Sequence, residues 1–276
     1  MRNTTATSSS VSHTRAKRNM ARFSANLGFL WTELDLPAAV ARAAAAGFGA
    51  VECHWPYATP AVELRSALRH AGIPLLCLNT RPGDLGAGDF GLTALPGREI
   101  EARVAIEEAL AYAAATDCRF VHVMAGRSGA EGRAIFLANL DHAADRAAEL
   151  GLNLLIEPIN HRDIPGYHLS LIEQAAELVL ELGRPNLRLM FDCYHVQIMQ
   201  GDLLRRLERH LPLIGHVQIA AVPLRQEPDT GEIAYDRVIN ALDAMGYRGW
   251  IGAEYRPAQS TDAGLGWLRN SLRRPD

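Results

Sequence analysis

Residues 147–157, AAELGLNLLIE, contain the pattern that decides the fold: the end of an alanine-rich helix, a glycine, and an apolar strand that closes on a carboxylate. The same order recurs in AAAAGFGAVEC (43–53), LRHAGIPLLCL (68–78), LELGRPNLRLMFD (180–192) and LDAMGYRGWIGAE (242–254). Apolar strands without alternation, each preceded by a helix, are typical of parallel β/α units, because such strands are buried on both faces. The pattern therefore predicts an α/β protein.

The glycine between helix and strand has a conformational reason. A helix often ends on a residue in the left-handed region, which glycine enters without a steric penalty. The glycines at this position are Gly47, Gly72, Gly151, Gly183 and Gly246. We expect each of them to end a helix. Ser170 and Glu173, at the start of another predicted helix, have the spacing of a capping box.

Counting these units along the chain predicts eight strands and eight helices. Strands are expected near 22–27, 49–54, 73–79, 119–124, 153–158, 187–192, 214–219 and 250–254. Helices are expected near 36–46, 60–71, 98–116, 131–150, 170–182, 199–210, 235–245 and 261–272. Eight such units close a (β/α)8 TIM barrel, for which about 250 residues suffice. An open doubly wound sheet is the alternative, although no GxGxxG motif follows the first strand.

The chain shows no internal domain boundary, so we expect a single barrel domain over residues 20–276. Residues 1–19 are rich in Ser and Thr, basic and without acidic residues, which predicts a disordered extension. The same composition suits an organellar transit peptide, but a tag or an upstream start codon is the preferred interpretation because Met20 opens the first strand. Residues 80–97 form a glycine-rich loop of a length that is usually functional.

Composition and charge exclude several classes of function. A net charge of −3 does not favour binding to nucleic acid or to acidic membranes. No apolar run approaches the roughly 18 residues of a membrane span. The only lysine is Lys17 in the N-terminal extension, so Schiff-base chemistry inside the barrel is excluded. The four cysteines have no zinc-site spacing, which predicts small buried thiols in a reducing, cytoplasmic setting.

Four successive strands in the C-terminal half carry a residue able to bind a metal ion. LNLLIEP ends at Glu157, LRLMFD ends at Asp192, IGHVQIA carries Gln218 and WIGAEY carries Glu254. In a closed barrel the C-terminal ends of the strands meet at one rim, where such barrels place their chemistry. Three carboxylates and one carboxamide oxygen form a hard oxygen site that suits Mg²⁺ or Mn²⁺. His216 is an alternative to Gln218, but position relative to the rim favours Gln218.

Other side chains are candidates for binding a substrate. Arg225 lies in the loop after the seventh strand, where a guanidinium suits a bidentate grip on a carboxylate. His195 could reach the site from the loop after Asp192, and hydrogen bonding to backbone is an equally good interpretation. Arg81 and Arg98 are weaker candidates, expected on the solvated surface. Residues expected to line the pocket, although each alone could equally pack in the core, are Glu52, His54, Trp55, Asn79 and His122.

At these residues the sequence resembles a known family. RFSANL, VE..WPY, PGD, PGRE, IEPIN, GHVQIA, EP.TGEI.Y and GYRGWIGAEY together resemble the hydroxypyruvate isomerases, which belong to the xylose isomerase-like TIM barrels. The resemblance covers about residues 20–269. It implies that Glu157 and Glu254 are catalytic glutamates. It further implies that these two residues, with Asp192 and Gln218, hold a divalent ion, typically Mg²⁺.

Two departures from the family pattern bear on the substrate. Many bacterial relatives have ADNP where this chain has AAVP at 220–223, and they have His where this chain has Leu78 before Asn79. Both changes leave the metal-binding set intact. A glutamine at position 218 also differs from the histidine usual in ketose epimerases.

The resemblance implies interconversion of hydroxypyruvate and 2-hydroxy-3-oxopropanoate (tartronate semialdehyde) by glutamate-mediated proton transfer through an enediolate. Arg225 or a neighbour would hold the substrate carboxylate. The expected partner is this small acid, with no nucleic acid and no membrane, and homo-oligomer formation stays open. The alternatives are an isomerase or 3-epimerase for a larger 2-oxo or 3-oxo sugar acid or ketose, and a non-catalytic sugar-acid-binding barrel. An endonuclease of this barrel class would need a histidine-rich multi-zinc site and a basic face.

Overall fold

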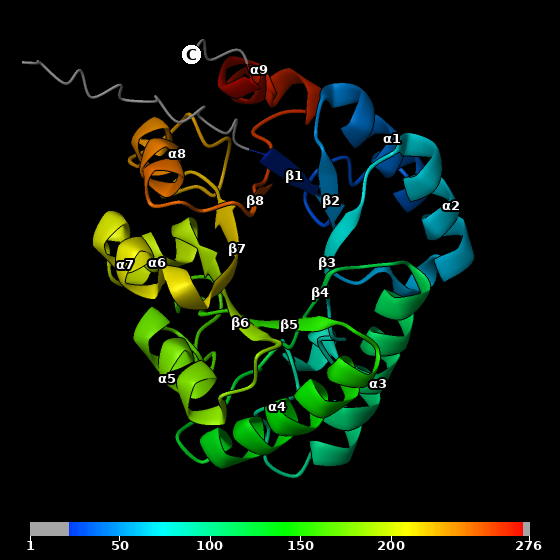
Figure 1. Ribbon diagram of the computed structural model, residues 1–276, viewed down its shortest axis with the longest axis vertical. Coiled ribbons are helices and arrows are strands. Elements are labelled where there is room, and N and C mark those ends of the chain that lie inside the picture. The colour runs from blue at the N-terminus through cyan, green and yellow to red at the C-terminus, as the bar shows by residue number, and fades with distance from the viewer. Residues whose placement is uncertain (1–21, 273–276) are drawn as a thin grey trace, which may run out of the picture.

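The computed structural model describes residues 22–272 and shows eight parallel strands closed into a barrel. The strands are β1 (Arg22–Asn26), β2 (Ala50–Glu52), β3 (Leu75–Asn79), β4 (Phe120–His122), β5 (Asn153–Ile156), β6 (Leu187–Asp192), β7 (Ile214–Ile219) and β8 (Trp250–Ala253). Strand β8 pairs with β1, which closes the ring (Figure 1). The predicted (β/α)8 barrel is therefore confirmed, and the open sheet is excluded. The predictions for residues 1–19 and Met20 fall outside the described residues.

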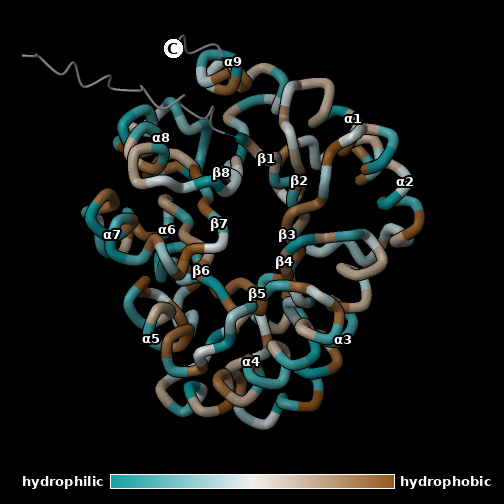
Figure 2. The backbone as a smooth tube through the Cα atoms, in the orientation of Figure 1, coloured by the Kyte–Doolittle hydropathy of each residue, from teal (hydrophilic) through white to brown (hydrophobic). Residues whose placement is uncertain are grey.

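Helices surround the barrel as an outer ring (Figure 1). They are α1 (Leu36–Ala46), α2 (Ala61–Ala71), α3 (Glu99–Ala115), α4 (Gly132–Glu149), α5 (Ile172–Leu182), α6 (Cys193–Met199), α7 (Leu203–His210), α8 (Tyr235–Ala244) and α9 (Gly266–Leu272). Four 3-10 turns, η1 (Pro56–Ala58), η2 (Leu85–Ala87), η3 (Leu211–Leu213) and η4 (Asp262–Gly264), complete the elements. Figure 2 shows bands of hydrophobic and hydrophilic residues along these helices, as expected where one face packs on the barrel.

The prediction of one helix over 199–210 is wrong. Helix α6 begins directly after β6, because the Asp192 carboxylate accepts a hydrogen bond of 2.8 Å from the backbone N–H of Tyr194 and so caps the first turn. Gly201, with a φ of +64°, then separates α6 from α7. The predicted helix at 261–272 likewise starts late, at Gly266, after η4.

The glycines between helices and strands have the predicted conformation. All five have a positive φ: 99° at Gly47, 70° at Gly72, 68° at Gly151, 60° at Gly183 and 86° at Gly246. Their backbone turns each chain segment from the outer helix back into the barrel. The fold is thus specified locally at every helix end that the sequence pattern identified.

The predicted capping box at Ser170 is wrong. Helix α5 begins two residues later than Ser170, and its first turn is closed by Gln174, whose side-chain oxygen accepts from the N–H groups of Ser170 and Leu171. The Glu173 carboxylate turns away and forms an ion pair with Arg206. Glutamine one position further along therefore takes the role expected of Glu173.

The buried side chains inside the barrel include an apolar group and a polar group. Strands β3 to β6 contribute the buried apolar cluster of Cys77, Phe120, Leu155 and Met190. Strands β1, β2 and β7 contribute the buried polar side chains Ser24, Glu52, His216 and Gln218. The main hydrophobic core lies between the barrel and the helices.

The glycine-rich loop over residues 80–97 has little regular structure. The 80–97 loop contains only the 3-10 turn η2 and is held against the chain after β4 through a bridge between Gly91 and Ala125.

Among residues 22–272, no helix combines the length and the apolar composition needed to cross a membrane. All four cysteines are buried and free, as predicted.

Candidate active site

A cavity of about 430 Å³ opens at the C-terminal ends of the strands. The residues expected in the site that line it are His54, Trp55, Asn79, His122, Glu157, His195, Arg225 and Glu254. They come from seven of the eight strands, β2 to β8, or from the segments that follow them. Convergence of polar side chains in one cavity of this size is typical of a small-molecule site.

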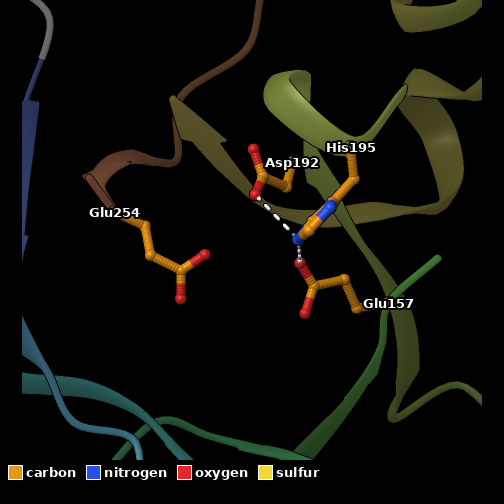
Figure 3. A group of neighbouring side chains, drawn as sticks. All are labelled: Glu157, Asp192, His195 and Glu254. Atoms are coloured by element: carbon orange, nitrogen blue, oxygen red, sulfur yellow. Dashed lines mark ion pairs between the residues drawn. The ribbon is translucent and has the colours of Figure 1, made fainter. Parts of the chain in front are cut away.

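Four of these side chains form a buried cluster able to hold a metal ion: Glu157, Asp192, His195 and Glu254. One ligand atom from each lies within 4.8 Å of the others. His195 Nε2 lies 3.7 Å from Glu157 Oε1 and 3.5 Å from Asp192 Oδ2. Figure 3 shows the histidine between these two carboxylates, with Glu254 facing the group from the opposite side. The structure thus brings together the three predicted carboxylates and adds an imidazole.

Gln218 is the fourth predicted ligand. It is the register partner of Asp192, so both side chains point into the barrel. Gln218 Nε2 donates a hydrogen bond of 2.9 Å to Glu52, whereas Gln218 Oε1 has no hydrogen-bond partner among the described residues. Glu157 Oε1 is buried without a hydrogen-bond partner in the same way. Buried acceptor oxygens without a donor are costly unless a cation or water binds them, so the donor set fits a divalent ion.

Arg225 reaches the cluster from the loop between β7 and α8, as the sequence predicts. Its Nη2 lies 2.6 Å from Glu254 Oε2 and 3.5 Å from Asp192 Oδ2. The guanidinium lies 4.9 Å from the ring centroid of Phe29 and 5.0 Å from that of Tyr194. Arg225 has a φ of +55°, a strained conformation for a residue with a Cβ. Strain of this kind is typical of functional positions whose surroundings fix the backbone.

Sequence reasoning missed several residues of the site, among them Asn26, Phe29 and Arg256. Asn26 Nδ2 donates a hydrogen bond of 2.8 Å to Glu254 Oε1, which also lies 3.0 Å from His54 Nε2. Arg256 lines the cavity, with its guanidinium 5.3 Å from the Phe29 ring centroid. Asn26 is the last residue of β1 and Arg256 follows Glu254 by two residues, so both could have been predicted from their places at strand ends, which meet at one rim. Phe29 stands in a turn and carries no comparable signal in the sequence.

The two glutamates have opposite pKa shifts. Burial, together with the nearby carboxylates of Glu254 and Asp192, raises the pKa of Glu157 well above its usual range. Burial raises the pKa of Asp192 to about 7, although Arg225 opposes this. Burial acts on Glu254 as well, but Arg225 and the hydrogen bond from His54 outweigh it and lower the pKa of Glu254 to about 2. The cavity thus holds one carboxyl group that favours its proton and one that favours its charge.

Two histidines of the cavity, His195 and His122, favour the neutral form. Burial lowers the pKa of His195 well below its ordinary value, and the charge of Arg225 acts in the same direction. Burial also lowers the pKa of His122 to about 4. Neutral imidazole is the form of histidine that binds metal ions.

Some predicted candidates lie outside the cavity. Glu52 and His216 are buried in the barrel and do not line the cavity, with His216 Nε2 3.0 Å from Glu52 Oε1. Arg98 forms an ion pair of 3.0 Å with Asp89 on the surface. Arg81 pairs in the same way with Glu108 at 2.5 Å. Their surface positions match the expectation from the sequence.

Comparison with known proteins places this chain in a family. The family model described as a xylose isomerase-like TIM barrel matches residues 40–271. The 2-oxo-tetronate isomerase of Cupriavidus necator is 47% identical over 260 residues, which cover 92% of this chain and all of that protein. The hydroxypyruvate isomerase of Escherichia coli K12 is 39% identical over 254 residues, which cover 90% of this chain and 98% of that protein.

A solved structure shows the same fold at comparable identity. The crystal structure described as an AP endonuclease of family 2 from Brucella melitensis has a TM-score of 0.88 and 40% identity, covering 91% of this chain and 99% of that one. The resemblance in the sequence is thus confirmed. The chain belongs to the xylose isomerase-like TIM-barrel family, together with the hydroxypyruvate and 2-oxo-tetronate isomerases.

Proposed function

We propose that the protein is a metal-dependent isomerase that interconverts hydroxypyruvate and 2-hydroxy-3-oxopropanoate (tartronate semialdehyde). The observation that carries the proposal is the convergence of Glu157 and Glu254, from opposite sides of the barrel, on one buried cluster in the cavity. Family membership supports the isomerase class. The family name alone would not specify which side chains act, but their convergence does suggest a pair for proton transfer.

A divalent ion, Mg²⁺ in preference to Mn²⁺, would be held by Glu157, Asp192, Gln218 and Glu254. The unpartnered oxygens of Glu157 and Gln218 support this set, and His195 lies within reach of it. When bound, such an ion stabilises negative charge that develops on the substrate oxygens. Oxygen ligands of this kind are the ones that Mg²⁺ prefers.

The two glutamates transfer the proton between carbon atoms. One carboxylate removes a proton from C3 of hydroxypyruvate, which gives an enediolate, and the other glutamate protonates C2 from across the substrate. A second proton passes from the C3 oxygen to the C2 oxygen, so that the carbonyl moves by one carbon. The opposite pKa shifts of Glu157 and Glu254 suit a pair in which one member holds a proton while the other lacks it.

The substrate carboxylate is bound by arginine. Arg225 lines the cavity beside the cluster. Arg256 also lines the cavity, and the guanidinium groups of both residues lie near the Phe29 ring. A guanidinium can bind a carboxylate through two parallel hydrogen bonds, which fixes the orientation of the acid. Binding at this end would leave the carbonyl and hydroxyl carbons directed toward the glutamates.

A second candidate substrate is 2-oxo-tetronate. The 47% identity to the isomerase of that name favours it, and a cavity of about 430 Å³ has room for one further carbon. The reaction would be the same shift of a carbonyl to the neighbouring carbon. An endonuclease activity is not supported, because the cluster among the described residues contains three carboxylates and only one histidine.

The test is a substrate comparison with purified protein. Hydroxypyruvate, 2-oxo-tetronate and a ketohexose are each incubated with Mg²⁺, and the products are followed by a coupled reductase and by NMR. We expect turnover of at least one of the two acids, no epimerisation of the ketohexose, and loss of turnover in excess chelator that returns with Mg²⁺. Turnover of neither acid, or full turnover after chelation, would contradict the proposal. Binding of the acids without turnover would instead indicate a non-catalytic barrel.

A further inference from the structure

Inside the barrel lies a network of four buried polar side chains: Ser24, Glu52, His216 and Gln218. Each is at most 2% exposed. The Glu52 carboxylate accepts hydrogen bonds from Ser24 Oγ at 2.5 Å and from Gln218 Nε2 at 2.9 Å. A carboxylate this deep is expensive to bury, so packing alone gives no reason for it. The groups that contact Glu52, among them Ser24 and Gln218, indicate what this buried carboxylate does.

The contact with Gln218 selects one orientation of an amide. An amide group carries a donor nitrogen and an acceptor oxygen on the same carbon, whereas a carboxylate can only accept. Glu52 therefore bonds to the nitrogen of the Gln218 amide and repels its oxygen. In the observed orientation Gln218 Oε1 is the atom that stays without a partner among the described residues.

The barrel is shaped to accommodate this pair. Gly252 on β8 is the register partner of Gln218 and stands two residues before Glu254. A Cβ at Gly252 would lie 2.4 Å from Glu52 Oε1 and 2.9 Å from Gln218 Cγ. Glycine at this position thus provides the space in which the carboxylate and the amide meet. Ser24 fixes the other carboxylate oxygen, which leaves Glu52 Oε2 for Gln218.

We propose that Glu52 is a positioning residue that fixes the amide of Gln218 with its oxygen presented as a ligand for the divalent cation. Glu52 itself touches neither the cation nor the substrate. The inference rests on the proposed function, because it requires that Gln218 belongs to the metal-binding set. It assigns to Glu52 a role different from the pocket lining that the sequence suggested.

The test measures Mn²⁺ affinity by EPR of the free ion, with wild type, Glu52→Gln, and the exchange variant Glu52→Gln with Gln218→Glu. Glutamine at 52 can meet Gln218 with either its oxygen or its nitrogen, so both amide orientations become accessible. We expect Glu52→Gln to weaken Mn²⁺ binding about 10- to 100-fold, the usual effect of losing a partner that orients a ligand. The exchange variant should regain affinity close to wild type, because a carboxylate at 218 presents an oxygen in either orientation.

Ser24→Ala is the matched control, since it removes a hydrogen bond from Glu52 but keeps the bond between Glu52 and Gln218. It should bind Mn²⁺ like wild type. Wild-type affinity in Glu52→Gln, or an exchange variant as weak as Glu52→Gln, would overturn the inference while leaving the proposed function intact. A wild-type protein that isomerises its substrate without binding Mn²⁺ or Mg²⁺ would overturn both.

Discussion

Asp192 belongs both to a helix cap and to the cluster that could hold a metal ion. Its carboxylate caps α6, and it lies 3.5 Å from both His195 Nε2 and Arg225 Nη2. These contacts place the side chain where it cannot reach solvent. The consequence is a pKa of about 7 for Asp192, raised mainly by burial.

This shift predicts a pH dependence of stability in the absence of metal. Between about pH 4 and pH 7 the folded protein keeps a proton on Asp192 that the unfolded chain has released, so the free energy of unfolding decreases as pH rises. Asp192→Asn removes this contribution. In excess chelator, urea unfolding should show the variant gaining stability relative to wild type as pH rises from 4 to 7.

At pH 7, bound metal should make wild type more stable than Asp192→Asn, the reverse of the order in chelator. A ligand at 100 times its Kd stabilises a folded protein by about 2.7 kcal/mol, so Mg²⁺ should restore wild type while Asp192→Asn gains much less. If the variant instead followed wild type across the whole pH range in chelator, the raised pKa of Asp192 would be disproved.

Arg225 provides a second prediction at this scale. Arg225→Lys keeps the positive charge but loses the planar pair of donors, so we expect kcat/KM for the oxo acid to fall by about tenfold or more, equal to about 1.4 kcal/mol. The loss should lie mainly in KM. Arg237→Lys, on the exposed face of α8, is the control and should be silent. Equal kinetic constants for Arg225→Lys and wild type would remove Arg225 from carboxylate binding.

At the scale of single residues, strand ends were predictable and turns were not. Glu157, Asp192 and Glu254 follow from a rule, because each terminates an apolar strand in a barrel whose strand ends meet at one rim. Arg225 was predictable only as a member of a loop. Phe29 was not predictable, since its place against Arg225 depends on tertiary contacts that no local pattern encodes.

Among the elements, the 80–97 loop forms part of the cavity wall through Phe90. Its shape depends on Gly91, which has a φ of +114° and where a Cβ would lie 2.6 Å from the backbone nitrogen of Gly126. Gly97 in the same loop also has a positive φ, +79°, but a Cβ there would meet nothing within 4 Å. A substitution at Gly97 therefore tests backbone strain alone, whereas a substitution at Gly91 tests backbone strain together with the close approach of Gly126.

We predict that Gly91→Ala is more damaging than Gly97→Ala. Both variants pay the cost of a positive φ, about 1–2 kcal/mol, but only the first forces two backbone segments apart. Gly91→Ala should therefore unfold at lower urea concentration than Gly97→Ala and show a higher KM for the substrate. Equal effects of the two substitutions on both measurements would mean that the loop does not depend on this close approach.

Helix α6 was not predicted, because the residue that caps it, Asp192, is also the last residue of the predicted strand. The sequence LRLMFD was correctly predicted as a strand, but its last residue also starts α6, so the helical character of Cys193–Met199 was hidden. Asp192 ends the strand and caps the helix, so one residue belongs to two elements and the apolar pattern indicates only the first. The glycine-terminated helices were predicted well because their signal is local.

At the scale of the whole molecule, closure of the ring brings the ends of β5 and β8 to the same rim. Glu157 and Glu254, separated by 97 positions in the sequence, belong to one cluster for this reason. The repeat of helix, glycine and strand predicts parallel β/α units, and the count of eight favours a closed ring over an open sheet, which the structure confirms. The orientation of individual side chains inside the ring, such as the Gln218 amide, depends on partners such as Glu52 that the repeat does not specify.

Proton transfer by these two carboxyl groups can be measured as the kcat of Glu157→Gln and Glu254→Gln at saturating Mg²⁺ and substrate. Glu177→Gln, on the exposed side of α5, serves as the control. If both glutamates transfer protons, each active-site variant loses a factor of about 10²–10⁴ in kcat, while the control keeps wild-type kcat. Wild-type kcat in either active-site variant would contradict this role.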